Sequence, residues 1–142
     1  MRFKNEKLAE WQEAKGWSNA RCAKFVGIAG PQTWALYKTG AIIPPVRIIN
    51  KIAVNMGISA FDLIAPSLAP GSDSKIIKFR HTALDMWREE HNCSQQACAQ
   101  LVGISAAAWS YYASGIRTPE SLDIFDLIST KLGLDVADLF EK

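Results

Sequence analysis

Apolar residues recur at intervals of three and four along most of the chain, which is the spacing of a helix with one buried face. Such stripes run through residues 75–91, 95–102, 106–114 and 119–132, and a short apolar turn follows at residues 135–140. In the first of them the apolar positions are Ile76, Ile77, Phe79, Ala83, Leu84 and Trp87. No segment alternates apolar and polar residues over the length of a strand. The pattern therefore predicts an all-α protein.

Residues suited to helix ends lie between these stripes. Ser94 and Ser105 each stand just before a stripe, where a hydroxyl can accept a hydrogen bond from the first turn of the helix. Residues that tolerate the left-handed conformation follow the stripes, namely Asn92, Gly103, Gly115 and Gly133. We therefore expect a unit of five short helical segments in this half of the chain.

The same order of elements occurs twice, because the chain contains an internal repeat. At an offset of 76 residues, Leu8, Trp11, Ser18 and Cys22 fall on Leu84, Trp87, Ser94 and Cys98. The offset is 75 at Trp34 and Trp109 and returns to 76 at Gly57 and Gly133. Residues 66–74 between the copies are rich in Pro, Gly and Ser, as linkers are. The sequence thus predicts a domain at residues 1–65, a linker at 66–74 and a second domain at 75–142.

In the first copy, Gly16, Gly27, Gly40 and Gly57 mark the predicted helix ends. Ser18 is the expected cap of the second helix, and Pro31 suits the first position of the third helix, where its missing N–H is not needed.

A short capped helix, a tight turn with glycine and a second short helix follow the plan of a helix-turn-helix. Residues 94–105, 112–119 and 132–140 resemble, in this order, three segments of the phage repressor and Cro type of DNA-binding domain. These are its second helix and turn, the segment after its recognition helix, and its closing turn. The first copy is similar to it at residues 18–23 and 57–64. The resemblance implies two tandem five-helix helix-turn-helix domains in a phage or prophage regulator of transcription that binds double-stranded DNA.

The resemblance also implies which side chains would read base edges, namely the outward ones at the start of the third helix. These positions hold Pro31, Gln32, Ala35 and Leu36 in the first copy and Ala106, Ala107, Ser110 and Tyr111 in the second. Gln32 can form a pair of hydrogen bonds with adenine, whereas Ser110 and Tyr111 cannot make a bidentate contact. We therefore expect weak base recognition, above all in the second copy.

Charge divides unequally between the copies. The whole chain has 16 basic and 14 acidic residues, a net charge of +2. Residues 1–71 hold nine basic and four acidic residues, a net of +5, whereas residues 72–142 hold seven and ten, a net of −3. Because cations release counterions from DNA phosphates, the first copy is predicted to make most of the DNA contact. The candidate contact residues are Asn19, Arg21, Lys24, Pro31, Gln32, Lys38 and Arg47 in the first copy and Gln95, Ser110, Tyr111 and Arg117 in the second.

A second hypothesis assigns the second copy to a protein partner, which includes another copy of this chain. Residues 106–112 carry alanines and aromatic residues that would form a flat apolar contact surface. Helical spacing equally allows Trp109 and Tyr112 to be core residues with only Tyr111 exposed. The alternative function is thus a protein-interaction module on a helix-turn-helix scaffold that has lost sequence-specific DNA binding.

Other constellations do not indicate catalysis. Cys22, Cys93 and Cys98 have no CxxC spacing, so we expect reduced thiols and neither a disulfide framework nor a zinc site. His81 and His91 lie ten residues apart, which on one helix is about 15 Å, too far for a shared ligand. We predict no enzyme activity, no cofactor and no metal. Because no apolar run reaches the ~18 residues of a membrane span and no secretory core follows the start, we predict a cytoplasmic protein without membrane association.

Overall fold

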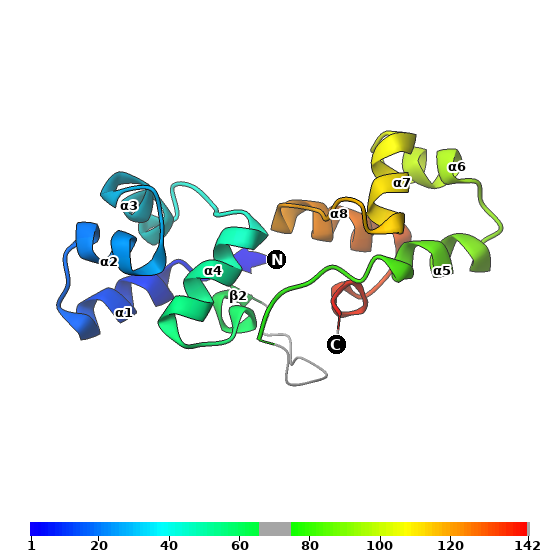
Figure 1. The fold of residues 1–142 in the computed structure, drawn as a ribbon. Helices are drawn as coiled ribbons and strands as arrows, with labels where there is room; N and C mark the ends of the chain where they lie inside the picture. Colours follow the sequence, from blue (N-terminus) through cyan, green and yellow to red (C-terminus); the bar gives the residue numbers. More distant parts are fainter. Residues whose placement is uncertain (66–74, 142) are drawn as a thin grey trace. The chain divides into compact units, whose positions relative to one another are not determined.

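The structure is a computed structural model that describes residues 1–65 and 75–141. The chain divides into two compact units, unit 1 at residues 1–77 and unit 2 at residues 78–141 (Figure 1). Helices form most of both units, which confirms the prediction of a mainly α-helical protein. The predicted linker, residues 66–74, lies outside the described residues, as does Lys142.

Unit 1 is built from four α-helices, a 3-10 turn and a pair of two-residue strands. In chain order they are β1 (Arg2–Phe3), α1 (Glu6–Lys15), α2 (Asn19–Val26), α3 (Pro31–Thr39), α4 (Val46–Met56), η1 (Ala60–Leu63) and β2 (Ile64–Ala65). The strands pair antiparallel, with Arg2 opposite Ala65. As predicted, the Ser18 hydroxyl caps α2 by accepting a hydrogen bond from the backbone N–H of Arg21, and Pro31 is the first residue of α3.

Unit 2 repeats the four helices and the final turn. Its elements are α5 (Thr82–Glu90), α6 (Gln95–Val102), α7 (Ala106–Ser114), α8 (Leu122–Leu132) and η2 (Val136–Leu139). Ser94 and Ser105 cap α6 and α7 as predicted. Asn92 has a φ of 51°, which confirms the expected left-handed residue after the first helix of this unit. An isolated antiparallel bridge between Phe79 and Phe140 joins the two ends of the unit.

The segment before α5 differs from the prediction. The apolar stripe predicts a helix from residue 75, but α5 begins only at Thr82. The Asn50 side chain forms hydrogen bonds with both backbone groups of Ile77. Its Oδ1 accepts from the Ile77 N–H at 2.8 Å, and its Nδ2 donates to the Ile77 carbonyl at 2.9 Å. Phe79 forms the bridge with Phe140, so these backbone groups bond outside a helix. Residues 75–77 accordingly pack with unit 1 rather than with unit 2.

Each unit has its own core around a tryptophan of its third helix. Trp34 in α3 and Trp109 in α7 are both fully buried. The surrounding core of unit 1 includes Leu8, Val26, Ile49, Ile52 and Leu63, and that of unit 2 includes Leu84, Val102, Phe125, Ile128 and Leu139. Cys22 and Cys98 are fully buried in these cores, where a thiol packs as a small hydrophobic group.

Candidate nucleic-acid interface

Two of the predicted contact residues meet at the N-terminus of α2. The Asn19 Oδ1 atom accepts a hydrogen bond from Lys38 Nζ at 2.8 Å. Lys38 comes from the last turn of α3, so this bond carries its ammonium group to the first turn of α2. The N-terminus of a helix presents unpaired N–H groups and a partial positive charge, which favour anions. The arrangement therefore places a cation beside an end of a helix that already attracts negative charge.

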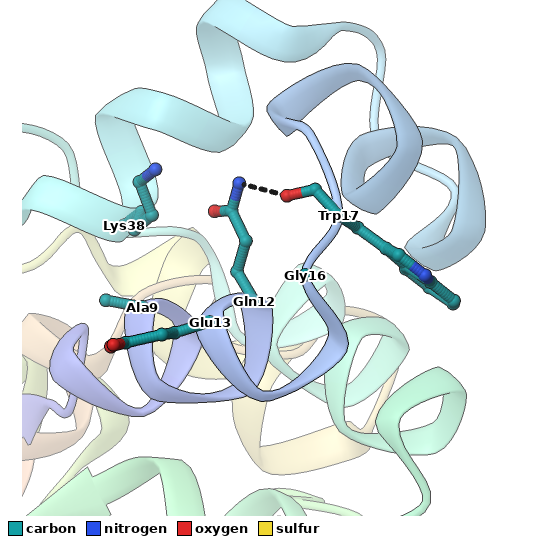
Figure 2. A pocket seen from close by; sticks show the side chains of 6 residues that line it. All are labelled: Ala9, Gln12, Glu13, Gly16, Trp17 and Lys38. Carbon is teal, nitrogen blue, oxygen red and sulfur yellow. Dashed lines mark hydrogen bonds between the residues drawn. The ribbon is translucent and has the colours of Figure 1, made fainter.

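Gln12 organises this group, although sequence reasoning did not select it. Its Nε2 donates to Asn19 Oδ1 and to the carbonyl of Trp17, each at 2.9 Å, and the bond to Trp17 is drawn in Figure 2. Its Oε1 accepts from the indole Nε1 of buried Trp34, also at 2.9 Å. Gln12 lies four residues after Leu8, on the buried face of α1. A polar side chain on an apolar stripe was the signal that could have identified it.

An open cleft of about 410 Å³ borders this hydrogen-bonded group. Its lining residues are Ala9, Gln12, Glu13, Gly16, Trp17 and Lys38 (Figure 2). The cleft brings together the C-terminal half of α1, the turn after it and the end of α3. Glu13 adds a carboxylate, which repels anions. The groups near this cleft that attract an anion are therefore the N-terminus of α2 and the ammonium group of Lys38.

Arg21 is held at the same end of α2 by an aromatic side chain. Its guanidinium carbon lies 4.3 Å from the centroid of the Trp17 ring, and Lys15 Nζ lies 5.6 Å from that ring. Trp17 is itself packed edge-on against Trp11 and Phe25, with centroids 5.6 and 5.1 Å away. A cation on an aromatic face keeps its charge available while its position is restricted.

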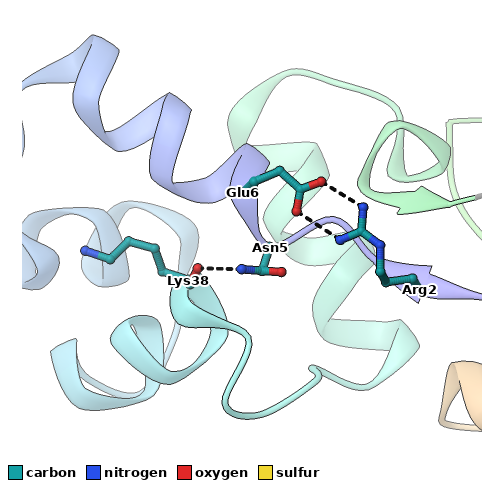
Figure 3. A network of polar contacts seen from close by, with 4 residues as sticks. All are labelled: Arg2, Asn5, Glu6 and Lys38. Carbon is teal, nitrogen blue, oxygen red and sulfur yellow. Dashed lines mark hydrogen bonds and ion pairs between the residues drawn. The ribbon is translucent and has the colours of Figure 1, made fainter.

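The N-terminal segment contacts the end of α3 through a hydrogen bond. Asn5 Nδ2 donates to the backbone carbonyl of Lys38 at 3.0 Å, as Figure 3 shows. Beside it, Arg2 binds the Glu6 carboxylate through both terminal nitrogens, at 2.9 and 3.1 Å. Hydrogen bonding from Arg2, aided by a bond from the Glu6 backbone N–H, lowers the pKa of Glu6 from 4.5 to about 2.

The other predicted residues of unit 1 lie outside this hydrogen-bonded group. Pro31 and Gln32 are exposed on the first turn of α3, Lys24 on the last turn of α2 and Arg47 on the first turn of α4. The Gln32 Oε1 atom lies 3.4 Å from the position that a Cβ on Gly30 would take, so the side chain folds over the turn between α2 and α3. The structure thus places Asn19, Arg21 and the Lys38 ammonium group at the start of α2 but leaves these four as separate surface positions.

In unit 2 the candidate residues form only one pair. The Arg117 guanidinium lies 4.9 Å from the centroid of the Tyr111 ring. Gln95 is exposed at the first position of α6, and Ser110 is half-buried. Of the aromatic residues of α7, Trp109 is buried, Tyr112 is half-buried and Tyr111 is exposed. This agrees with the interpretation in which Trp109 is a core residue and only Tyr111 of the three is exposed, but Tyr112, also expected in the core, is only half-buried.

The counterpart of Gln12 in unit 2 is Arg88, 76 residues later. A guanidinium has only donors, so Arg88 cannot accept the hydrogen bond that Trp34 gives to Gln12 in unit 1. In the part of the chain that the structure describes, Arg88 Nε and Trp109 Nε1 are buried without a hydrogen-bond partner. Asp85 Oδ1 is 3.8 Å from Arg88 Nε, an ion pair without a hydrogen bond. Unit 2 therefore lacks the hydrogen bonds by which Gln12 positions Asn19, and through it Lys38, in unit 1.

Comparison with known protein families, with curated proteins and with solved structures gives no match to this chain. Within residues 1–65 and 75–141, no helix combines the length and the apolar character that crossing a bilayer requires. The same ranges contain no cluster of three or more His, Cys, Asp and Glu side chains that could hold a metal ion.

Proposed function

We propose that the chain is a DNA-binding transcriptional regulator whose two units are tandem helix-turn-helix domains of the phage repressor and Cro type. The order of helices in each unit supports this. In unit 1, α2 and α3 are eight and nine residues long and pack against each other, and α6 and α7 repeat these lengths in unit 2. Glycines with φ of 78° and 89°, Gly27 and Gly103, end the first helix of each pair. A side chain there would be strained, which suits the tight turn of this motif.

Unit 1 makes the main DNA contact in this proposal, and the observation that carries it is the group at the start of α2. The bond from Lys38 to Asn19 and the stacking of Arg21 on Trp17 hold two cations at one helix N-terminus. A backbone phosphate there would meet helix N–H groups and both cations. Because the cations are already restrained, binding loses less side-chain entropy than it would with two free side chains.

In this proposal, side chains of α3 recognise the bases. Gln32 is exposed on its first turn and supplies an amide that can bind adenine through two hydrogen bonds in the major groove. Pro31 precedes it at the position closest to the duplex. Lys24 and Arg47 contribute further phosphate contacts, which add affinity without sequence preference.

Binding of the full chain to labelled duplex DNA across a salt series tests the proposal. Affinity is expected to fall steeply with salt, because each phosphate contact releases a counterion. Lys38→Ala should weaken binding to all sequences and reduce the slope of log K against log salt by about one. Lys131→Ala is the matched control, because it removes one exposed cation from α8 of unit 2. Absence of binding at low salt would contradict the proposal.

Gln32→Ala tests the base contact separately. In a selection from random duplexes, it should remove a preference for one adenine position worth about 1–3 kcal/mol. The affinity for unrelated DNA should stay the same, because phosphate contacts are untouched. Gln96→Ala, which removes an exposed glutamine from α6, is the control. An unchanged sequence preference for Gln32→Ala would assign recognition to other residues.

A second candidate function is favoured by the surface of unit 2. On and just after α7, Tyr111 is 37% exposed and Ile116 is 71% exposed, and Ala106 and Ala107 are exposed on the first turn of the helix. This apolar surface in the acidic half of the chain suits a protein partner better than DNA. Tyr111→Ala separates the two functions, since it should disrupt self-association in sedimentation experiments under the second hypothesis and leave DNA binding by unit 1 unchanged.

A further inference from the structure

Cys93 and Cys98 flank the start of α6. Ser94 is the N-cap, so Cys93 immediately precedes the cap and Cys98 is the fourth residue of the helix. Apolar side chains at these two positions often pack against each other over the first turn of a helix. Cys98 is fully buried, whereas Cys93 is half-buried. Burial, followed by the charge of the Cys93 thiolate and hydrogen bonding to it, raises the pKa of Cys98. The Cys93 thiol donates to the carbonyl of His91 at 3.4 Å. The two cysteines therefore lie on either side of the Ser94 cap at the start of α6, Cys98 covered and Cys93 within reach of solvent.

Unit 1 lacks this pair. Trp17 stands at the position of Cys93, and Cys22 at the position of Cys98. Cys22 is fully buried and has no second thiol beside it at this helix end. The start of α6 in unit 2 thus has two thiols, whereas the start of α2 in unit 1 has one, which is buried.

We propose that Cys93 and Cys98 form a reversible oxidation site, at which a hydroperoxide such as hydrogen peroxide converts the two thiols to an intramolecular disulfide. The thiolate of Cys93 attacks one peroxide oxygen, the O–O bond breaks, and the departing hydroxide takes up a proton to become water. Cys98 then attacks the sulfenic sulfur of Cys93, the S–O bond breaks, and the leaving hydroxide takes the Cys98 proton as a second water. The thiols lose two electrons, and the peroxide gains them.

The order of the two steps follows from burial. Cys93 is reached first because it is partly exposed, and Cys98 resolves the sulfenic acid because it is the second thiol at the same helix start. The new bond closes a short ring around the Ser94 cap, whose hydroxyl accepts from the Ala97 N–H at 3.1 Å. Oxidation therefore ties the chain entering α6 to the body of that helix, and a dithiol reductant releases it.

Mass spectrometry of the full chain tests this site. The reduced protein is exposed to hydrogen peroxide, blocked with N-ethylmaleimide and cleaved with trypsin. Cys93 and Cys98 then lie in one peptide, residues 89–117, and Cys22 lies in another, because Arg21 and Lys24 flank it. We expect the first peptide to lose two hydrogens and both sites of N-ethylmaleimide labelling. The rate should be about tenfold or more above the rate at which Cys22 loses its labelling site. Dithiothreitol should restore both thiols.

Two variants assign the roles of the sulfur atoms. Cys93→Ser should abolish peroxide oxidation of residues 89–117, because it removes the accessible thiol from a partly exposed position. Cys98→Ala should leave Cys93 as a sulfenic acid that dimedone traps, or as a disulfide between two chains. Cys22→Ala is the matched control and should oxidise like the unaltered chain. Sulfinic acid on Cys93 in the unaltered chain, an interchain disulfide as its main product, or oxidation no faster than that of Cys22 would overturn the proposal.

Discussion

The two units differ most where the core tryptophan meets the surface. In unit 1, Trp34 donates to Gln12, which in turn holds Asn19 and the backbone of Trp17. In unit 2, Arg88 replaces the acceptor with a donor, and the Trp109 indole N–H is left without a partner among the described residues. Both tryptophans are nevertheless fully buried. The tryptophan therefore keeps its place through packing, whereas the polar group that positions surface residues in unit 1 depends on one amide.

One hydrogen bond to the third helix is made by a different side chain in each unit. In unit 1, Asn5 bonds to the carbonyl of Lys38 near the end of α3. In unit 2, His81 bonds to the carbonyl of Ala113 near the end of α7. For His81 this requires a proton on Nδ1, because a carbonyl only accepts. Gly40 and Gly115 follow these carbonyls, and a Cβ on either would come within 3.2 or 3.3 Å of the Asn5 or His81 side chain.

Replacing Gln12 should have the largest effect, because it separates the two units most clearly. Gln12→Leu leaves the buried Trp34 indole N–H without its acceptor and removes one of the two donors to Asn19 Oδ1, which should cost unit 1 about 1–3 kcal/mol. It should also weaken DNA binding, since Asn19 no longer has a fixed position for Lys38. Amide and indole hydrogen exchange in the full chain reports on each unit by its own tryptophan. Equal loss of protection at Trp34 and Trp109 would contradict the prediction.

The converse change in unit 2 should be stabilising. Arg88→Gln supplies the acceptor that Trp109 lacks and removes a partly buried charge, so unit 2 should gain about 1 kcal/mol. Slower exchange of the Trp109 indole N–H, with Trp34 unchanged, would be the expected result. Arg88→Met is the control, because it removes the charge without providing an acceptor. The prediction fails if the Met variant stabilises unit 2 as much as the Gln variant.

Exchanging the residues at the third-helix carbonyl should have a smaller effect. His81→Asn copies the side chain of unit 1 and should change the stability of unit 2 by less than about 0.5 kcal/mol. His81→Ala, which removes the hydrogen bond to Ala113, should cost about 0.5–1.5 kcal/mol. Thermal unfolding of the two variants, followed through signals of unit 2, makes the comparison. A larger loss for Asn than for Ala would show that the two sites are not equivalent.

The smallest effect is expected from the Arg2–Glu6 pair, which unit 2 does not repeat. The pKa of Glu6 is lowered to about 2 in the folded chain from an ordinary 4.5. The pair therefore stabilises unit 1 fully above the ordinary value, and this contribution is lost as the pH falls from about 4.5 toward 2. Because both side chains are exposed, salt should screen the effect. Titration of the Glu6 carboxyl by NMR at low and at high salt measures it.

Local signals allowed most helices to be predicted, because caps and helix ends depend on residues close in the chain. Ser18, Ser94 and Ser105 cap helices where the sequence placed them. The helix predicted from residue 75 was wrong over its first seven residues, since its apolar stripe serves other contacts. Asn50 is 27 residues from Ile77, and no local pattern reports a bond over that separation.

The candidate site was predictable only as a set of residue types. Charge selected Arg21 and Lys38, Asn19 lies in the segment that carries the resemblance, and the structure places the three side chains at the start of α2. Lys24, Gln32 and Arg47 are exposed but stand apart from them. Gln12 escaped selection because its role is to join groups up to 22 residues away, not to present a charge.

The sequence by itself determined the duplication, the all-α class, most helix ends and the unequal charge of the two halves, because spacing, caps and composition act locally or additively. Tertiary structure decided which polar side chains find partners. The same tryptophan at the same place in both units is bonded in one and unpaired in the other, and the difference arises from a residue one turn beyond Leu8 or Leu84. Hydrogen bonds require an acceptor at a defined distance and angle, and only the packed helices set that geometry.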